Sequence, residues 1–275
     1  MTLLVVGGTG FLGTELTRQA VSAGHHTIAA WSRSPGESGL TTWRKLDLRD
    51  HGQIATLLEQ VRPEMVVNAS SGGADWQVTA EGPIHLAMAA AKYGCRLVHV
   101  SSDAVFSGIG RTHYDETCLP DPVTPYGAAK AAGEAGVLAV LPEAVVARTS
   151  LIIGHGRSEH ERLVHDLTSK ARDGVLFTDN RRCPVHVSDL ASALLELALG
   201  HDGGIHHLGG PEALSRYDLG LLIARRDGID PSLLPAGRTS DRNYQGAVDV
   251  RLDSSATQHR LRTTLRGASI FLSQD

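Results

Sequence analysis

The hydrophobic residues of this chain form short apolar runs that alternate with stretches of helical spacing. The apolar runs predict buried strands, and the amphipathic stretches between them predict helices. The expected strands are residues 3–6, 27–31, 65–68, 96–100 and 145–148, and the expected helices are residues 14–23, 53–61, 82–92 and 126–141. This alternation predicts an α/β fold, a doubly wound parallel Rossmann sheet with right-handed crossovers.

The strand–helix rhythm breaks after residue 149. Residues 155–179 and 211–246 have helix- and loop-rich patterns, and Ser215 with Asp218 forms a capping box before an apolar helix. We therefore expect two lobes. Residues 1–150 form the main domain, to which residues 183–200 return, and residues 151–275 form mostly a smaller carboxyl-terminal lobe.

A glycine-rich turn, with Gly7, Gly10 and Gly13 spaced GxxGxxG, joins the first strand to the first helix. Strand, turn and helix together present main-chain N–H groups and a positive helix end to a dinucleotide pyrophosphate. Glycine turns also close ordinary strand–helix joints, so the motif alone leaves both interpretations open.

Tyr126 and Lys130 lie four residues apart on a helix that begins with Thr124 as a plausible N-cap and Pro125. Their side chains share one helix face. An adjacent ammonium favours the phenolate and brings the tyrosine pKa, ordinarily about 10, toward the range of acid–base catalysis. A surface tyrosine beside a solvated lysine is the alternative.

A polar loop containing Ser102 and Asp103 follows the strand at residues 96–100. Ligands bind at the carboxyl ends of strands in open parallel sheets. A hydroxyl group there can donate a hydrogen bond to a substrate carbonyl oxygen while the tyrosine protonates that oxygen.

In this order, the glycine turn, Ser102 and the Tyr-x-x-x-Lys motif resemble the extended short-chain dehydrogenase/reductase family, and within it the dTDP-4-dehydrorhamnose reductase branch. Residues 148–154 (RTSLIIG), 183–191 (CPVHVSDLA) and 252–255 (LDSS) extend the resemblance over nearly the whole chain. The resemblance implies a dinucleotide-binding main domain and a substrate-binding second lobe.

The resemblance also implies roles for individual residues. Tyr126 is the expected general acid, Lys130 holds the nicotinamide ribose and lowers the tyrosine pKa, and Ser102 orients the carbonyl group. The cofactor-binding residues would be these two helix residues with Gly7, Thr9, Gly10, Phe11, Leu12, Gly13, Ser32, Arg33, Ser34, Asp47, Leu48, Asn68, Ala69 and Ser70. The substrate-binding residues would be Ser102, Asp103, Arg148, Ser150 and His186.

The end of the second strand indicates which cofactor is used. An NAD site usually has an acidic residue there, whereas this chain has Ser32, Arg33 and Ser34, which suit a 2′-phosphate. We therefore expect NADPH rather than NADH, with an arginine in a solvated turn as the alternative. Residues 70–76 depart from the branch pattern, and Thr79 stands near the family's frequent asparagine, which puts a proton-relay role there in doubt.

The expected reaction is reduction of a ketone, either a 4-keto-6-deoxy nucleotide sugar or a related natural-product intermediate. A nucleotide-sugar epimerase with tightly bound NAD(P) and a non-catalytic regulatory subunit remain open. A dehydratase is disfavoured, because Ala104 stands where that activity needs a glutamate. Besides Arg148, the arginines that could hold a diphosphate are Arg157, Arg162, Arg181 and Arg182, and each is equally plausible as a solvated surface residue.

The composition of the chain bears on its expected partners, metal content and cellular compartment. A net charge of −4 carries no polycation signature, so nucleic acid is not an expected partner. The first residues are expected to form a strand rather than a secretory leader, and no apolar run reaches membrane-spanning length. Three cysteines without CxxC spacing fit a reducing cytoplasm. The 14 histidines are scattered, so we expect no metal. The expected partner is a small-molecule ketone, without a membrane, and a homodimer is compatible with these features.

Overall fold

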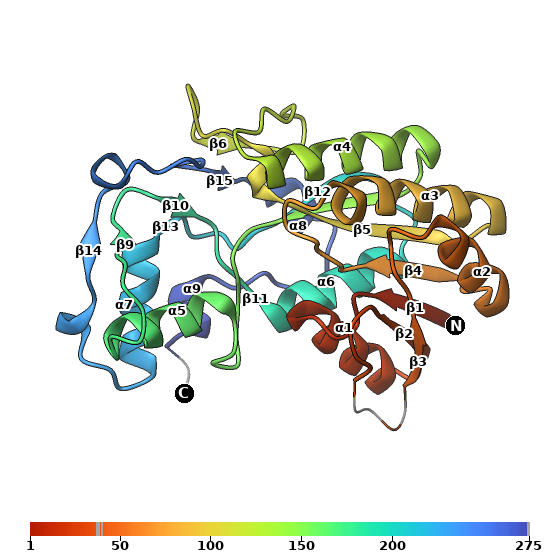
Figure 1. The fold of residues 1–275 in the computed structure, drawn as a ribbon, viewed down its shortest axis with the longest axis horizontal. Coiled ribbons are helices and arrows are strands. Elements are labelled where there is room, and N and C mark those ends of the chain that lie inside the picture. The colour runs from red at the N-terminus through yellow and green to blue at the C-terminus, as the bar shows by residue number, and fades with distance from the viewer. Residues whose placement is uncertain (37–38, 40, 274–275) are drawn as a thin grey trace.

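The computed structural model describes residues 1–36, 39 and 41–273, and its centre is a seven-stranded sheet (Figure 1). The strand order is β12-β7-β5-β4-β1-β2-β3, and neighbouring strands pair in parallel. The strands are β1 (Thr2–Val6), β2 (His26–Trp31), β3 (Thr42–Lys45), β4 (Met65–Asn68), β5 (Arg96–Ser102), β7 (Val145–Thr149) and β12 (Gly204–Leu208). The predicted α/β fold with a doubly wound parallel sheet is confirmed.

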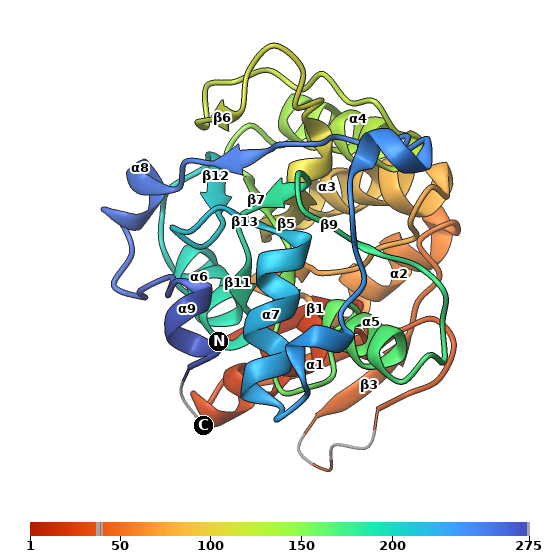
Figure 2. The same ribbon diagram turned by 90° about the vertical axis from the view of Figure 1, so that its left-hand side faces the viewer.

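Helices cover both faces of the sheet because its strands are apolar on both sides (Figures 1 and 2). On one face, α1 (Phe11–Ser22) and α6 (Val187–Leu199) bury the side chains of Leu3 and Val5. On the other face, α2 (His51–Val61), α3 (Gly82–Tyr93) and α4 (Pro125–Val140) cover Leu4 and Val6. The resulting three-layer arrangement leaves the carboxyl edge of the sheet open for a ligand.

Helix α1 and strands β3 and β12 of the main domain differ from the sequence-based expectation. Strand β3, with the residues TWRK, was not among the expected strands. Helix α1 begins three residues early, at Phe11, because Gly10 is its N-cap and the glycine turn runs directly into the helix. Strand β12 was not predicted, because its residues GIHHL contain two histidines and no apolar run. Both histidines are nevertheless buried where β12 pairs with β7. The segment that returns to the main sheet therefore continues past the expected residues 183–200.

A smaller lobe packs its own apolar core beside the carboxyl edge of the sheet. Its helices are α5 (Glu159–Thr168), α7 (Arg216–Arg226) and α9 (Ala268–Phe271). Short strand pairs join them: β8 (Ile152–Ile153) with β11 (Val185–His186), β9 (Leu176–Phe177) with β14 (Ala236–Gly237), and β10 (Arg181–Arg182) with β13 (Leu214–Ser215). The predicted capping box of Ser215 and Asp218 is present at the start of α7.

The remaining elements are short. Strand β6 (His113–Tyr114) pairs with β15 (Arg251–Leu252), and α8 (Ser255–Gln258) follows β15. A π-helix spans Gln77–Glu81, and 3₁₀ turns span Asp103–Val105, Pro231–Leu233 and Thr239–Arg242. No helix in the described ranges is long and apolar enough to cross a membrane.

We expect Gly13→Ala to lower the free energy of unfolding by about 2 kcal/mol, because an added Cβ would lie 2.0 Å from the main-chain oxygen of Gly7. Gly10→Ala is the matched control. Its Cβ would lie 3.2 Å from the same oxygen, so its loss should stay below about 1 kcal/mol. Urea denaturation measures both, and equal losses would show that the turn does not require close packing at Gly13.

Candidate active site

A cavity of about 1170 Å³ opens at the carboxyl edge of the sheet, between the main domain and the smaller lobe. Residues that follow or end four of the strands line it: Gly7 after β1, Ser32 after β2, Ser70 after β4 and Ser102 at the end of β5. Ser150, just after β7, lies on the same wall. Because parallel strands end at one edge, residues distant in sequence meet there.

The glycine turn forms the floor of the cavity at β1. Gly7 has a φ of +80°, and a Cβ at this position would lie 2.8 Å from the main-chain nitrogen of Ser70. No side chain caps the N-terminus of α1 within the described part of the chain, and Thr9, Gly10, Phe11 and Leu12 line the cavity. Free N–H groups at a helix N-terminus attract anions. Gly13 is not among the lining residues, and it acts instead in packing.

The wall beyond β2 and β3 includes Arg33, Asp47 and Leu48. Arg33 is exposed and forms no ion pair with any residue that the structure describes, so its guanidinium is available to a ligand. Asp47 accepts hydrogen bonds from the Arg49 main-chain N–H and side chain at 3.0 and 3.4 Å. Ser34 is exposed and lies outside the described lining.

The cavity wall after β4 is formed by Ala69, Ser70, Ser71, Gly72 and Gly73. Most of these residues fall in the segment 70–76 that departs from the branch pattern. The buried Thr79 hydroxyl donates to the Gly73 carbonyl at 2.9 Å and accepts from the Gly72 N–H at 3.2 Å. Thr79 therefore shapes this loop through its side chain. Asn68 was expected beside the cofactor, but it is fully buried behind the wall and does not line the cavity.

Ser102, Tyr126 and Lys130 all line the same cavity. Helix α4 begins as predicted, with Thr124 accepting a hydrogen bond from the Gly127 N–H and Pro125 in the first turn. Gly127 brings α4 close to the loop after β5, since a Cβ there would lie 2.0 Å from the Ala104 carbonyl oxygen. This close approach places the tyrosine and lysine beside Ser102.

Hydrogen bonds orient two of these three groups. Lys130 is buried and donates from Nζ to the Val100 carbonyl oxygen at 2.9 Å. Ser102 Oγ accepts from the Ala104 N–H at 3.2 Å and donates to Asp103 Oδ1 at 3.3 Å. Asp103 also accepts from the Ser150 hydroxyl at 2.7 Å, so the loop after β5 is tied to the loop after β7.

Burial governs the ionisation of the tyrosine and lysine. Burial raises the pKa of Tyr126, while the nearby hydroxyls of Ser102 and Ser71 act in the opposite direction. Burial lowers the pKa of Lys130 to about 8, and the negative charge of Glu134 opposes that change. The net effect on the phenol is thus opposite to the lowering expected from Lys130 alone. The phenol is protonated at neutral pH.

Arg148 was expected to contact substrate, but it is fully buried away from the cavity. Its Nη2 lies 2.8 Å from Glu134 Oε2, its Nε donates to both carboxylate oxygens at 3.1 Å, and its Nη1 donates to the Cys118 carbonyl. An ion pair between β7 and α4 therefore replaces the predicted substrate contact.

His186 was also expected to face the substrate, and it too lies outside the described lining. It is the N-cap of α6, where its Nδ1 accepts from the Ser188 N–H at 3.3 Å. Its ring packs against Phe271, with 5.2 Å between the ring centroids. The side chain therefore belongs to the junction between the lobes.

The smaller lobe contributes a cationic wall that sequence reasoning identified only in part. Of the arginines that the sequence offered for a diphosphate, Arg157, Arg162 and Arg182 line the cavity, whereas Arg181 does not. Arg216, His160 and Tyr244 also line it, and no motif in the sequence pointed to them. Arg216 donates to His160 Nδ1 at 3.2 Å, and burial lowers the pKa of His160 to about 3, so this imidazole is neutral.

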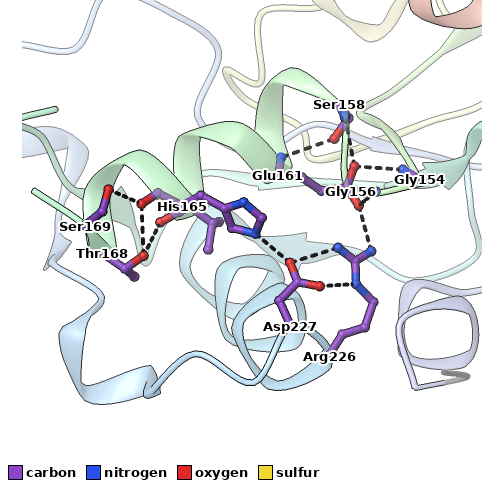
Figure 3. Close-up of polar contacts among 10 residues, drawn as sticks. Gly154, Gly156, Ser158, Glu161, His165, Thr168, Ser169, Arg226 and Asp227 are labelled. Atoms are coloured by element: carbon purple, nitrogen blue, oxygen red, sulfur yellow. Dashed lines mark hydrogen bonds and ion pairs between the residues drawn. The ribbon is translucent and has the colours of Figure 1, made fainter. Parts of the chain in front are cut away.

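Glu161 fixes the start of α5 through the contacts shown in Figure 3. His160 and Arg162 of the cavity wall belong to this helix. The Glu161 carboxylate accepts from the main-chain N–H groups of Gly154, Gly156 and Ser158 and lies 2.6 Å from Arg226 Nη1. Arg226 also pairs with Asp227. The segment before α5 and the end of α7 are thereby held around one buried carboxylate.

No group of three or more His, Cys, Asp or Glu suited to a metal ion occurs among the described residues.

Comparison with protein families gives a match over residues 1–266 to the RmlD substrate binding domain. A dTDP-4-dehydrorhamnose reductase of Mycobacterium tuberculosis is 32% identical over 245 residues, which cover 83% of this chain and 76% of that protein.

Two solved structures share the fold. A hypothetical dTDP-4-dehydrorhamnose reductase from Sulfolobus tokodaii superposes with a TM-score of 0.83 at 28% identity, covering 97% of each chain. A Bacillus anthracis dTDP-4-dehydrorhamnose reductase in complex with NADP has a TM-score of 0.82 at 18% identity, covering 99% of this chain and 97% of that one.

We expect Arg148→Met to lower the free energy of unfolding by about 3–5 kcal/mol, because it leaves Glu134 buried without its partner. Arg157→Met, at an exposed residue of the cavity wall, should change stability by less than about 0.5 kcal/mol. Chemical denaturation separates the two variants. A stable Arg148→Met protein with weakened substrate binding would restore the original assignment of Arg148 to the substrate site.

Proposed function

The chain belongs to the RmlD substrate binding domain family, and from this premise we propose that it is an NADPH-dependent reductase of a 4-keto-6-deoxy nucleotide sugar or a related natural-product ketone. Membership of this family, together with its reductase relatives, indicates that the chain is an NAD(P)-dependent oxidoreductase. One observation carries the finer proposal: Ser102, Tyr126 and Lys130 line the same cavity as the glycine turn.

The residues at the floor of the cavity fit a nicotinamide dinucleotide. The open N-terminus of α1, with Thr9, Gly10, Phe11 and Leu12 beside it, would hold the pyrophosphate. Arg33 and Ser32 would hold the 2′-phosphate of NADPH. When bound, the cofactor would supply the hydride, and the protein supplies position and electrostatics. The NADP in the Bacillus anthracis structure supports this choice of cofactor class.

The three catalytic side chains suit proton donation to a ketone. Burial keeps the Tyr126 phenol protonated, so it holds the proton that the carbonyl oxygen needs as that oxygen becomes an alkoxide. Ser102 would donate a hydrogen bond to the same oxygen. Lys130 uses one donor on Val100, which leaves the others of its ammonium group for the nicotinamide ribose.

The cationic wall of the smaller lobe supports a substrate that carries phosphate. Arg157, Arg162, Arg182 and Arg216 all line the cavity. Arg182 Nε lies 3.5 Å from Asp103 Oδ2, which links this wall to the catalytic loop. Arginine is the residue best suited to bind a diphosphate through paired hydrogen bonds. A nucleoside diphosphate here would direct the attached keto sugar toward Tyr126.

We expect Tyr126→Phe to lower kcat by about 10² to 10⁴-fold and to leave NADPH binding nearly unchanged, because it removes the acid and keeps the ring. NADPH oxidation measured against a panel of keto nucleotide sugars and polyketide-type ketones tests this. Tyr93→Phe on α3, where the ring packs under Arg62, is the matched control and should retain full activity.

Two results would contradict the reductase. Wild-type turnover by Tyr126→Phe would favour a non-catalytic subunit whose helix pair is structural. Conversion of a nucleotide sugar into its epimer without net NADPH oxidation would favour an epimerase.

We expect Arg33→Ala to weaken NADPH binding by about 10- to 100-fold and NADH binding very little, because only NADPH carries the 2′-phosphate. Arg44→Ala is the matched control, since Arg44 is exposed on β3 and lies outside the described cavity lining. Fluorescence titration with each cofactor gives the two dissociation constants. Equal losses for both cofactors, or tighter wild-type binding of NADH, would refute the NADPH assignment.

A further inference from the structure

Behind the cavity wall, Asn68 of β4 and His99 of β5 face each other across the sheet in register. Both side chains are fully buried, and Asn68 Nδ2 lies 3.2 Å from His99 Nδ1. Neither side chain lines the cavity, and the mechanism above uses neither of them. Burying two polar side chains next to Lys130 costs free energy, so their contacts are expected to serve a structural or functional purpose.

Donor and acceptor chemistry assigns the proton on His99. The main-chain N–H and the hydroxyl of Ser70 both donate to Asn68 Oδ1, at 3.2 and 2.6 Å. A main-chain N–H can only donate, so the amide oxygen of Asn68 must face Ser70 and its NH₂ group must face His99. An NH₂ group also only donates, so Nδ1 must accept. His99 is therefore neutral and carries its proton on Nε2.

The surroundings of His99 favour its neutral form. Burial lowers the pKa of His99 well below its usual value, and the ammonium of Lys130, which faces it from α4, lowers that pKa further. The Nε2 atom points toward Gly133 of α4, where an added Cβ would lie 3.7 Å away. Nε2 is buried and has no hydrogen-bond partner among the described residues, so the contact of Nδ1 with Asn68 alone assigns the proton to Nε2.

The same contacts reach the glycine turn. Ser70 lines the cavity, and its main-chain nitrogen and Cα lie 2.8 Å from where a Cβ on Gly7 would stand. A shift of Ser70 would therefore disturb the turn assigned to the pyrophosphate. Polar contacts run from His99 through Asn68 to Ser70, and a main-chain contact completes the path to Gly7.

We propose that His99 is a positioning residue for the cofactor: its unprotonated Nδ1 fixes the orientation of the Asn68 amide, and that amide holds Ser70 against the glycine turn. This inference rests on the proposed function in one respect, the assignment of the dinucleotide to this cavity. It assigns no contact between His99 and the cofactor, and it predicts an effect on binding that is separate from the chemistry of Tyr126.

The test compares His99→Leu with His99→Asn. Leucine fills similar space without an acceptor, whereas the asparagine amide oxygen can take the place of Nδ1. In folded protein we expect His99→Leu to weaken NADPH binding by about 5- to 10-fold, with kcat at saturating NADPH within about twofold of wild type. His99→Asn should bind NADPH within about twofold of wild type.

A second measurement needs no variant. In ¹⁵N-labelled wild-type protein, imidazole spectra between about pH 6 and 8 should show His99 neutral with its proton on Nε2. A proton on Nδ1 would overturn the proposal even if His99→Leu failed to fold. Wild-type affinity in folded His99→Leu, or equal losses in both variants, would also overturn it.

Cofactor titration of the wild type distinguishes a failure of the proposed function from a failure of the role of His99. If the wild type binds neither NADPH nor NADH, the proposed function fails and the cofactor role of His99 fails with it. If the wild type binds NADPH and His99→Leu binds it equally well, only the role of His99 fails.

Discussion

The whole site depends on a main-chain contact at the point where the order of the strands reverses. Strand β1 lies between β4 and β2, so the loops after β1 and β4 leave the sheet side by side. Gly7 and Ser70 meet there so closely that no Cβ fits on Gly7. Such a reversal opens a crevice at the carboxyl edge of a parallel sheet. Loops after β2, β5 and β7 extend this crevice, and the smaller lobe closes it.

Buried charge is concentrated on α4. Glu134 lies one helical turn beyond Lys130, and Arg148 from β7 holds its carboxylate. Removing these charges from water costs several kcal/mol for each ion, which only close pairing offsets. Burial lowers the pKa of Lys130, and the negative charge of Glu134 only partly opposes that change. The helix that carries the proposed catalytic pair is thus held against the sheet by the ion pair of Arg148 with Glu134, whose carboxylate also affects the lysine pKa.

The sequence predicted those elements whose conformation is determined by residues close together in the chain. Apolar runs, the glycine turn, Thr124 with Pro125, and the capping box at Ser215 each specify their own conformation. What could not be read locally depended on distant partners. Arg148 looked like a substrate ligand because nothing nearby in sequence indicated Glu134 as its buried partner. Strand β12 was missed because its histidines are buried only by their neighbours in the sheet. Arg216 lies within the predicted capping box of α7, which indicates the start of a helix but not that this side chain enters the cavity.

The route of the chain constrains how the two lobes can move. The chain leaves the main sheet after β7, returns to it at α6 and β12, and leaves again after β12. It then pairs with β6 through β15, outside the main sheet, and ends in the smaller lobe with α9. A hinge made of a single linker would let one lobe swing freely, but here several crossing strands would have to bend together. Motion between the lobes is therefore expected to be a small shear and not a hinge closure. A ligand would then enter a cleft that is already formed.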